Sequence, residues 1–119
     1  MESGRITIID APVSEVKAFH DRFGPDYFAR IHPGEAESLT ILLRGKEGYR
    51  ICSSDAIVFK VLGNLGKPEL SISLEKALSE VGLGRPLDWQ YTEEFRRKFL
   101  KEGSIDRIQG RGHMRKSLD

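Results

Sequence analysis

The stretches His32-Pro33-Gly34-Glu35-Ala36-Glu37 and Ile51-Cys52-Ser53-Ser54-Asp55 decide the fold expected of this chain. The first predicts the start of a helix, and the second predicts the end of a strand. If that strand runs parallel to its neighbours, carboxyl ends of strands and amino ends of helices share one sheet edge, where open α/β folds bind ligands. Glu35 and Asp55 would then face one crevice, which suits a divalent cation beside a phosphodiester.

Hydrophobic patterns on either side of these stretches predict alternating strands and helices. We expect short strands at 5–10, 49–53 and 70–72, because these segments are rich in β-branched or apolar residues. Helical spacing and capping residues predict helices at 14–23, 34–44, 55–62 and 73–81 and a last one from Thr92 onward. This order predicts an α/β fold: a small three-layer domain with a mostly parallel short sheet flanked by helices. A sheet this narrow would favour a homo-oligomer, in which a partner chain covers its edges.

Length and charge predict one domain followed by a basic tail. The 119 residues, of which 39% are hydrophobic, suffice for one core, which we assign to residues 1–108. The net charge of +1 hides an asymmetry. Residues 95–119 hold eight basic and three acidic side chains, a net charge of +5, and the rest of the chain carries −4. Residues 109–119 lack periodicity, so we expect them to form a flexible tail.

Two further features exclude classes of protein. No apolar run approaches the roughly 20 residues that a membrane-spanning helix needs, so we expect no membrane contact and a cytoplasmic location. The single cysteine, Cys52, lies in an apolar strand pattern and predicts an ordinary buried thiol. Neither zinc binding nor cysteine chemistry is indicated.

Each of the two acids also has a structural explanation. Asp55 stands where a strand meets a helix, and an aspartate there caps the helix and contributes about 0.5 to 2 kcal/mol. Glu35 lies in the first turn of its helix, where the positive end of the helix dipole favours a carboxylate. The functional interpretation depends on the two acids occurring together at one expected edge.

Residues 31–83 resemble the carboxyl-terminal half of a PIN domain. The similarity comprises a helix start of Gly-Glu-Ala-Glu type, a strand ending in Ser-Asp, an apolar helix and a short strand with a small-residue turn. The resemblance implies a metal-dependent ribonuclease that uses clustered acids to hold Mg²⁺ or Mn²⁺, or a catalytically diminished relative that binds RNA. It implies that Glu35 and Asp55 are catalytic metal ligands. Because many PIN proteins are toxins, it also implies an antitoxin-like protein partner.

The start of the chain departs from the PIN pattern and leaves two interpretations open. PIN domains begin with a strand that ends in an aspartate, and their mid-domain glutamate follows much later than the 25 residues that separate Asp10 from Glu35. In one interpretation the strand at 5–10 is a later strand, and the acidic cluster is incomplete. In the other, this strand takes the first position, and Asp10 joins Glu35 and Asp55 as a metal ligand.

The basic residues and an aromatic stripe support two different functions. Four basic side chains of the last helix would hold RNA phosphates by charge: Arg96, Arg97, Lys98 and Lys101. Alternatively, the chain is a non-catalytic α/β binding or oligomerisation module. Its last helix would then dock on a second subunit through Tyr91, Phe95 and Phe99.

Overall fold

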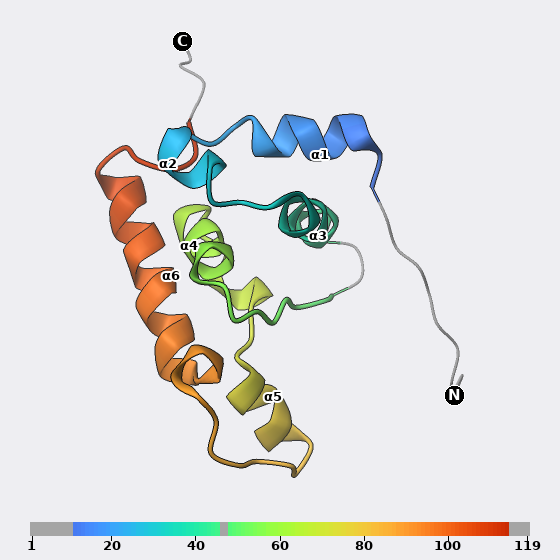
Figure 1. Cartoon of the computed structure of the whole chain (residues 1–119), viewed down its shortest axis with the longest axis vertical. Coiled ribbons are helices and arrows are strands. Elements are labelled where there is room, and N and C mark those ends of the chain that lie inside the picture. The colour runs from blue at the N-terminus through green and yellow to red at the C-terminus, as the bar shows by residue number, and fades with distance from the viewer. Residues whose placement is uncertain (1–10, 46–47, 115–119) are drawn as a thin grey trace.

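Helices and their connections make up the computed structural model of this chain, which describes residues 11–45 and 48–114 (Figure 1). The described residues form six α-helices: α1 (Val13–His20), α2 (Pro25–Phe28), α3 (Pro33–Leu43), α4 (Ala56–Asn64), α5 (Leu74–Glu80) and α6 (Glu93–Ile108). Two 3₁₀ turns, η1 (Pro68–Leu70) and η2 (Trp89–Tyr91), precede α5 and α6. No helix in the described residues is long and apolar enough to cross a membrane.

The predicted α/β fold with a parallel sheet is wrong, because the described residues contain no strand. The segments expected as strands at 49–53 and 70–72 do run in parallel, but they share a single bridge between Ile51 and Ser71. Ile51 N–H donates to the Leu70 carbonyl (2.8 Å), and Ile72 N–H donates to the Ile51 carbonyl (2.9 Å). The expected strand at 5–10 lies outside the described residues.

Helical turns on both sides keep this pairing short. Leu70 belongs to η1, and Ser73 already caps α5, so only Ser71 and Ile72 are free to extend. On the other segment, Asp55 caps α4 four residues after Ile51. Without a sheet, the argument that a second chain must cover sheet edges has no basis. Cys52, expected to be buried in a strand, is exposed.

A helix lies at each predicted place, although α1 ends at His20 and has no side-chain cap, and side-chain caps mark the starts of α4, α5 and α6. Ser73 Oγ accepts the N–H of Lys76 at 3.0 Å, and Thr92 Oγ1 accepts the N–H of Phe95 at 3.2 Å, so both hydroxyls cap their helices as expected. After α3, Gly45 adopts a φ of +68°, the left-handed conformation that ends many helices. Helix α2 was not predicted, since four residues are too few for a periodic pattern.

Helix α4 is the centre of the molecule. Its residues Val58, Phe59, Val61 and Leu62 are at most 1% exposed. In Figure 1, α6 lies along one flank of α4, and α1 and α3 lie together on the other side. The expected aromatic stripe faces this core: Phe95 is buried and packs edge-on against Phe59, Phe99 and Trp89.

Helices α4 and α6 pack closely against each other. A Cβ placed at Gly63 would lie 2.0 Å from the Leu100 carbonyl oxygen, and one at Gly103 would lie 2.0 Å from the Lys60 carbonyl oxygen. Two glycines on facing helices therefore let the backbones approach directly. This contact fixes which residues of α6 lie beside the start of α4 and which lie beside its end.

Part of the expected tail packs against the body of the molecule. The buried Asn64 side chain donates to the Arg111 carbonyl (2.8 Å) and accepts from the His113 N–H (2.8 Å). His113 also pairs with Phe23 in an antiparallel bridge, and Met114 N–H donates to the Arg22 carbonyl. Residues 111–114 therefore connect the end of α6 to the loop between α1 and α2.

Candidate cation site at the starts of two helices

Glu35 and Asp55 lie close together in the structure, at the amino ends of α3 and α4. With His32 they form a cluster in which one ligand atom from each residue lies within 4.8 Å of the others. Glu35 and Asp55 are half-buried, and His32 is exposed. Two segments 20 residues apart in the chain thus bring two carboxylates and one imidazole to a single point on the surface.

Each of these residues has a capping role in its own helix. His32 and Glu35 form a capping box at the start of α3, in which Glu35 Oε1 accepts the His32 N–H at 3.0 Å. Asp55 is the N-cap of α4, and its Oδ1 accepts the Ile57 N–H at 3.3 Å. The Asp55 backbone N–H donates to Ser53 Oγ at 3.0 Å. These bonds fix the direction of both carboxylates.

The charges in this cluster are unbalanced. Burial raises the pKa of Glu35, and a hydrogen bond with Asp55 and the negative charge of Asp55 raise it further. The His32 backbone N–H opposes this shift. Two carboxylates at this separation repel each other, and either a shared proton or a bound cation relieves the repulsion.

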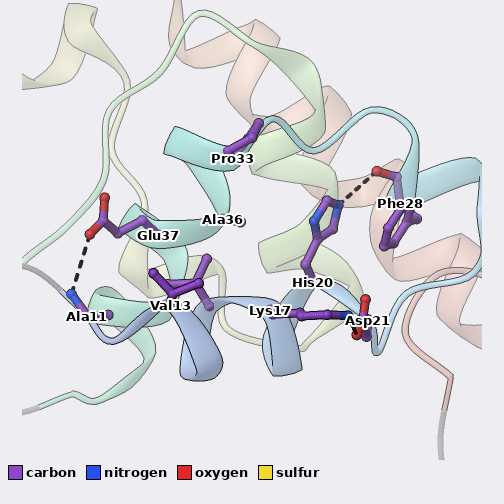
Figure 2. Close-up of a pocket in the computed structure, with 10 residues that line it drawn as sticks. Ala11, Val13, Lys17, His20, Asp21, Phe28, Pro33, Ala36 and Glu37 are labelled. Carbon is purple, nitrogen blue, oxygen red and sulfur yellow. Dashed lines mark hydrogen bonds and ion pairs between the residues drawn. The ribbon is translucent and has the colours of Figure 1, made fainter.

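The neighbouring acid Glu37 faces the other side of α3. It accepts the N–H of Ala11 at 3.4 Å and lines a groove of about 370 Å³ between α1 and α3 (Figure 2). Figure 2 shows His20 turned to the Phe28 carbonyl (2.9 Å) and Lys17 paired with Asp21 (2.7 Å). The polar groups around this groove are engaged within the protein, and Val13, Val16, Pro33 and Ala36 make its walls mainly apolar.

The basic residues expected to contact RNA lie on α6, and three of them are paired within the protein. Arg96 donates to Ser71 Oγ (2.8 Å) and the Pro68 carbonyl (3.1 Å) and pairs with Glu93 (2.6 Å). It therefore ties α6 to the segment between α4 and α5, whose Ser71 is bridged to Ile51. Two neighbours are paired within α6, Arg97 with Glu93 at 3.1 Å and Lys98 with Glu102 at 3.8 Å, and Lys101 is exposed.

A second polar cluster, which sequence reasoning missed, joins α2, α4 and α6. Asp106 accepts the Tyr27 hydroxyl at 2.8 Å and Arg111 Nη2 at 3.1 Å, and Lys60 Nζ lies 3.6 Å from it. Burial alone would raise the pKa of Asp106, but these hydrogen bonds and the charges of Lys60 and Arg111 outweigh it and lower the pKa. Burial and Asp106 raise the pKa of Tyr27. The sequence feature that could have indicated this cluster is Lys60, the single charged residue of the apolar helix α4.

Asp10, the third acid considered from the sequence, lies outside the described residues. No protein-family model matches the chain, and no curated protein or solved structure is significantly similar to it. The function must therefore be argued from the residues of this chain.

Proposed function

We propose that the chain binds Mg²⁺ or Mn²⁺ at Glu35 and Asp55, with His32 as a third ligand, and that this site acts on RNA. The activity would be that of a PIN-type metal-dependent ribonuclease or of a catalytically diminished relative that binds RNA. The observation that carries the proposal is the convergence of three ligand groups within 4.8 Å. The PIN-like sequence pattern supplies the RNA substrate.

The donor set suits a hard divalent cation bound weakly. Mg²⁺ keeps several waters and takes one or two carboxylates from the protein, while substrate phosphates supply further oxygens. An imidazole ligand favours Mn²⁺ over Mg²⁺ at the same point. A bound ion would lower the pKa of a coordinated water and neutralise charge on a phosphodiester.

The side chains themselves supply position and charge. The capping bonds hold one oxygen of Glu35 and one of Asp55, so little conformational entropy remains to be lost when a cation binds. The half-buried setting of these carboxylates strengthens their attraction for a cation relative to freely exposed acids. Asp10 decides between catalysis and binding, because two carboxylates alone hold an ion weakly.

The first experiment is a Mn²⁺ titration followed by thermal unfolding of metal-free protein. With a dissociation constant near 1 mM, 10 mM Mn²⁺ should raise the Tm by about 5 °C. Glu35→Gln and Asp55→Asn should abolish the rise, and both retain the caps because glutamine and asparagine serve these positions well. Glu94→Gln is the matched control, since Glu94 is an exposed first-turn acid of α6.

Cleavage of single-stranded RNA in Mn²⁺ tests the enzymatic half of the proposal. Loss of cleavage in Asp55→Asn and Asp10→Asn identifies a ribonuclease with three acids. A metal response with RNA binding but no cleavage identifies the diminished relative. If neither Mn²⁺ nor Mg²⁺ changes the Tm of the wild-type protein, the cation site is refuted.

The protein partners inferred from the sequence remain separate predictions. A sizing measurement at several concentrations tests the homo-oligomer, and co-expression with the neighbouring genes tests the antitoxin-like partner. A tight dimer that ignores divalent cations would favour a binding or oligomerisation module in place of the cation site.

A further inference from the structure

The polar cluster around Asp106 surrounds an open cavity. The cavity has a volume of about 300 Å³ and is lined by Asp26, Tyr27, Arg30, Lys60, Asp106 and Arg111. The three cations come from three places in the chain: the end of the α2 region, the middle of α4 and the segment after α6. We refer to these six residues as the Lys60 pocket.

Lys60 is ion-paired with two carboxylates, but at distances that leave its ammonium donors room for a closer acceptor. Its side chain is 14% exposed, and its Nζ lies 3.6 Å from Asp106 and 4.0 Å from Glu102, beyond hydrogen-bond distance in both cases. The ammonium also lies 5.4 Å from the centroid of the Tyr27 ring. An ammonium group carries three donors, and a largely buried one is costly to leave without acceptors.

Asp106 orients the pocket and leaves it cationic. Its two oxygens are engaged by Tyr27 and Arg111, so it holds the Arg111 guanidinium beside Lys60. Arg30, at the rim, is exposed and forms no side-chain bond with another described residue. With Asp26 and Asp106 counted against the three cations, the lining carries one net positive charge.

From this arrangement we propose that the Lys60 pocket binds a phosphate group. The Arg30 guanidinium offers paired donors that match the oxygens of phosphate. Lys60 and Arg111 add positive charge beside the cavity, although Arg111 Nη2 already donates to Asp106 and Gln109. A carboxylate ligand would satisfy fewer of these donors. The phosphate has two chemical sources, a free phosphate ion or the backbone of a nucleic acid.

The position of the pocket favours the nucleic-acid source, and this part of the inference rests on the proposed function. Arg30 lies two residues before His32, and Lys60 lies about 7.5 Å along α4 from Asp55. An RNA strand that places one phosphate at Glu35 and Asp55 would therefore bring a neighbouring phosphate to the Lys60 pocket. Arg30, Lys60 and Arg111 would then take the phosphate-holding role that the sequence suggested for the basic residues of α6.

Titration of ¹⁵N-labelled protein with inorganic phosphate tests the site. The wild-type protein should show saturable amide shifts at 26–31 and 107–111, measured against sodium chloride at equal ionic strength. Arg30→Gln should weaken phosphate binding about tenfold, because a charged hydrogen-bond pair is lost. Arg85→Gln, which removes another exposed arginine, is the control and should leave the affinity unchanged.

Two further measurements separate the possible outcomes. Lys60→Gln should abolish the phosphate shifts, and the spectrum without phosphate reports whether the variant is folded. Equal phosphate affinity of Arg30→Gln and Arg85→Gln would overturn the proposal, as would shifts that chloride reproduces.

The phosphate source is tested in the Asp55→Asn background, where the cation site is removed. Persistent inorganic-phosphate binding there shows that the Lys60 pocket stands even if the proposed function fails. Single-stranded RNA should compete with inorganic phosphate in the wild-type protein and lose affinity in Arg30→Gln. RNA that binds without displacing phosphate would refute the nucleic-acid source and leave the free ion as the ligand.

Discussion

Glu35 and Asp106 are both partly exposed carboxylates beside α4, but their surroundings treat the negative charge in opposite ways. Glu35 lies against Asp55, and its pKa is raised. Asp106 lies among Tyr27, Lys60 and Arg111, and its pKa is lowered. One site therefore favours the arrival of a positive charge, whereas the other already has its countercharges. The difference teaches that a partly exposed carboxylate marks a candidate binding site in one place and a link between helices in the other.

The largest effect on the free energy of unfolding should come from a substitution that forces α6 away from α4. Gly103→Ala places a methyl group 2.0 Å from the Lys60 carbonyl, so the two helices must move apart. We expect a loss of about 3 kcal/mol in the free energy of unfolding, measured with urea. Asp106 would move away from Lys60, while Glu35 and Asp55, on α3 and α4, would keep their arrangement.

Gly34→Ala is the control for this change. Gly34 lies in the first turn of α3, and an added Cβ there meets nothing within 4 Å. Alanine should leave stability unchanged or raise it by about 0.5 kcal/mol. An equal loss in both variants would contradict the close packing of α4 on α6.

A smaller effect should follow removal of the charge of Asp106. Asp106→Asn leaves Lys60 and Arg111 without their carboxylate, and we expect a loss of about 1 to 2 kcal/mol at pH 7. Asp88→Asn serves as the control, because Asp88 is exposed and its side chain makes no capping bond. The difference between the two variants in urea unfolding gives the contribution of the ionic cluster.

The pH dependence of that difference has a definite sign. The pKa of Asp106 is lowered below 3.8, so its contribution is present above that value and is lost as the pH falls through the folded-state pKa. The stability gap between wild type and Asp106→Asn should therefore narrow in acid. A gap that stays constant down to the lowest pH at which the protein is folded would show that the charge of Asp106 is not responsible.

The smallest effect on the free energy of unfolding should come from Glu35→Gln in metal-free protein. The pKa of Glu35 is raised above 4.5, so its stabilising contribution is present below that value and is lost as the pH rises through the folded-state pKa. Removing this charge should stabilise the protein by about 0.5 kcal/mol at pH 7, after allowance for solvent screening. Unfolding in EDTA at pH 7 and pH 4 checks the sign, and destabilisation at pH 7 would contradict the repulsion.

Particular residues show which features of the structure the sequence predicts. Ser73, Thr92 and Asp55 correctly predict helix starts, because a cap acts within three residues of itself. The sequence spacing allows ion pairs of Glu93 with Arg97 and of Glu94 with Lys98. The first pair forms, whereas Lys98 pairs with Glu102. Both carboxylates are one turn from Lys98, so the sequence alone does not choose between them.

At the candidate site, too, the sequence identified individual residues but not the contacts between distant segments. The sequence singled out Glu35 and Asp55 but expected a sheet edge to bring them together, and the structure joins them through the starts of α3 and α4 without a sheet. Tyr27 and Asp106, 79 residues apart in the chain, gave no local signal of their contact. Arg96 looked available for phosphate, yet it is bound to Ser71 and Pro68.

The sequence by itself determined where the main helices lie, because helical periodicity and caps depend on neighbours one turn away. Tertiary structure decided that the segments around Ile51 and Ser71 form one bridge instead of a sheet, since a strand requires partners whose flanking turns leave it room. It also decided which charges are neutralised, because a counterion is chosen by distance in space and not by separation in sequence. Lys60 and Asp106 meet only because Gly63 and Gly103 let α4 and α6 approach.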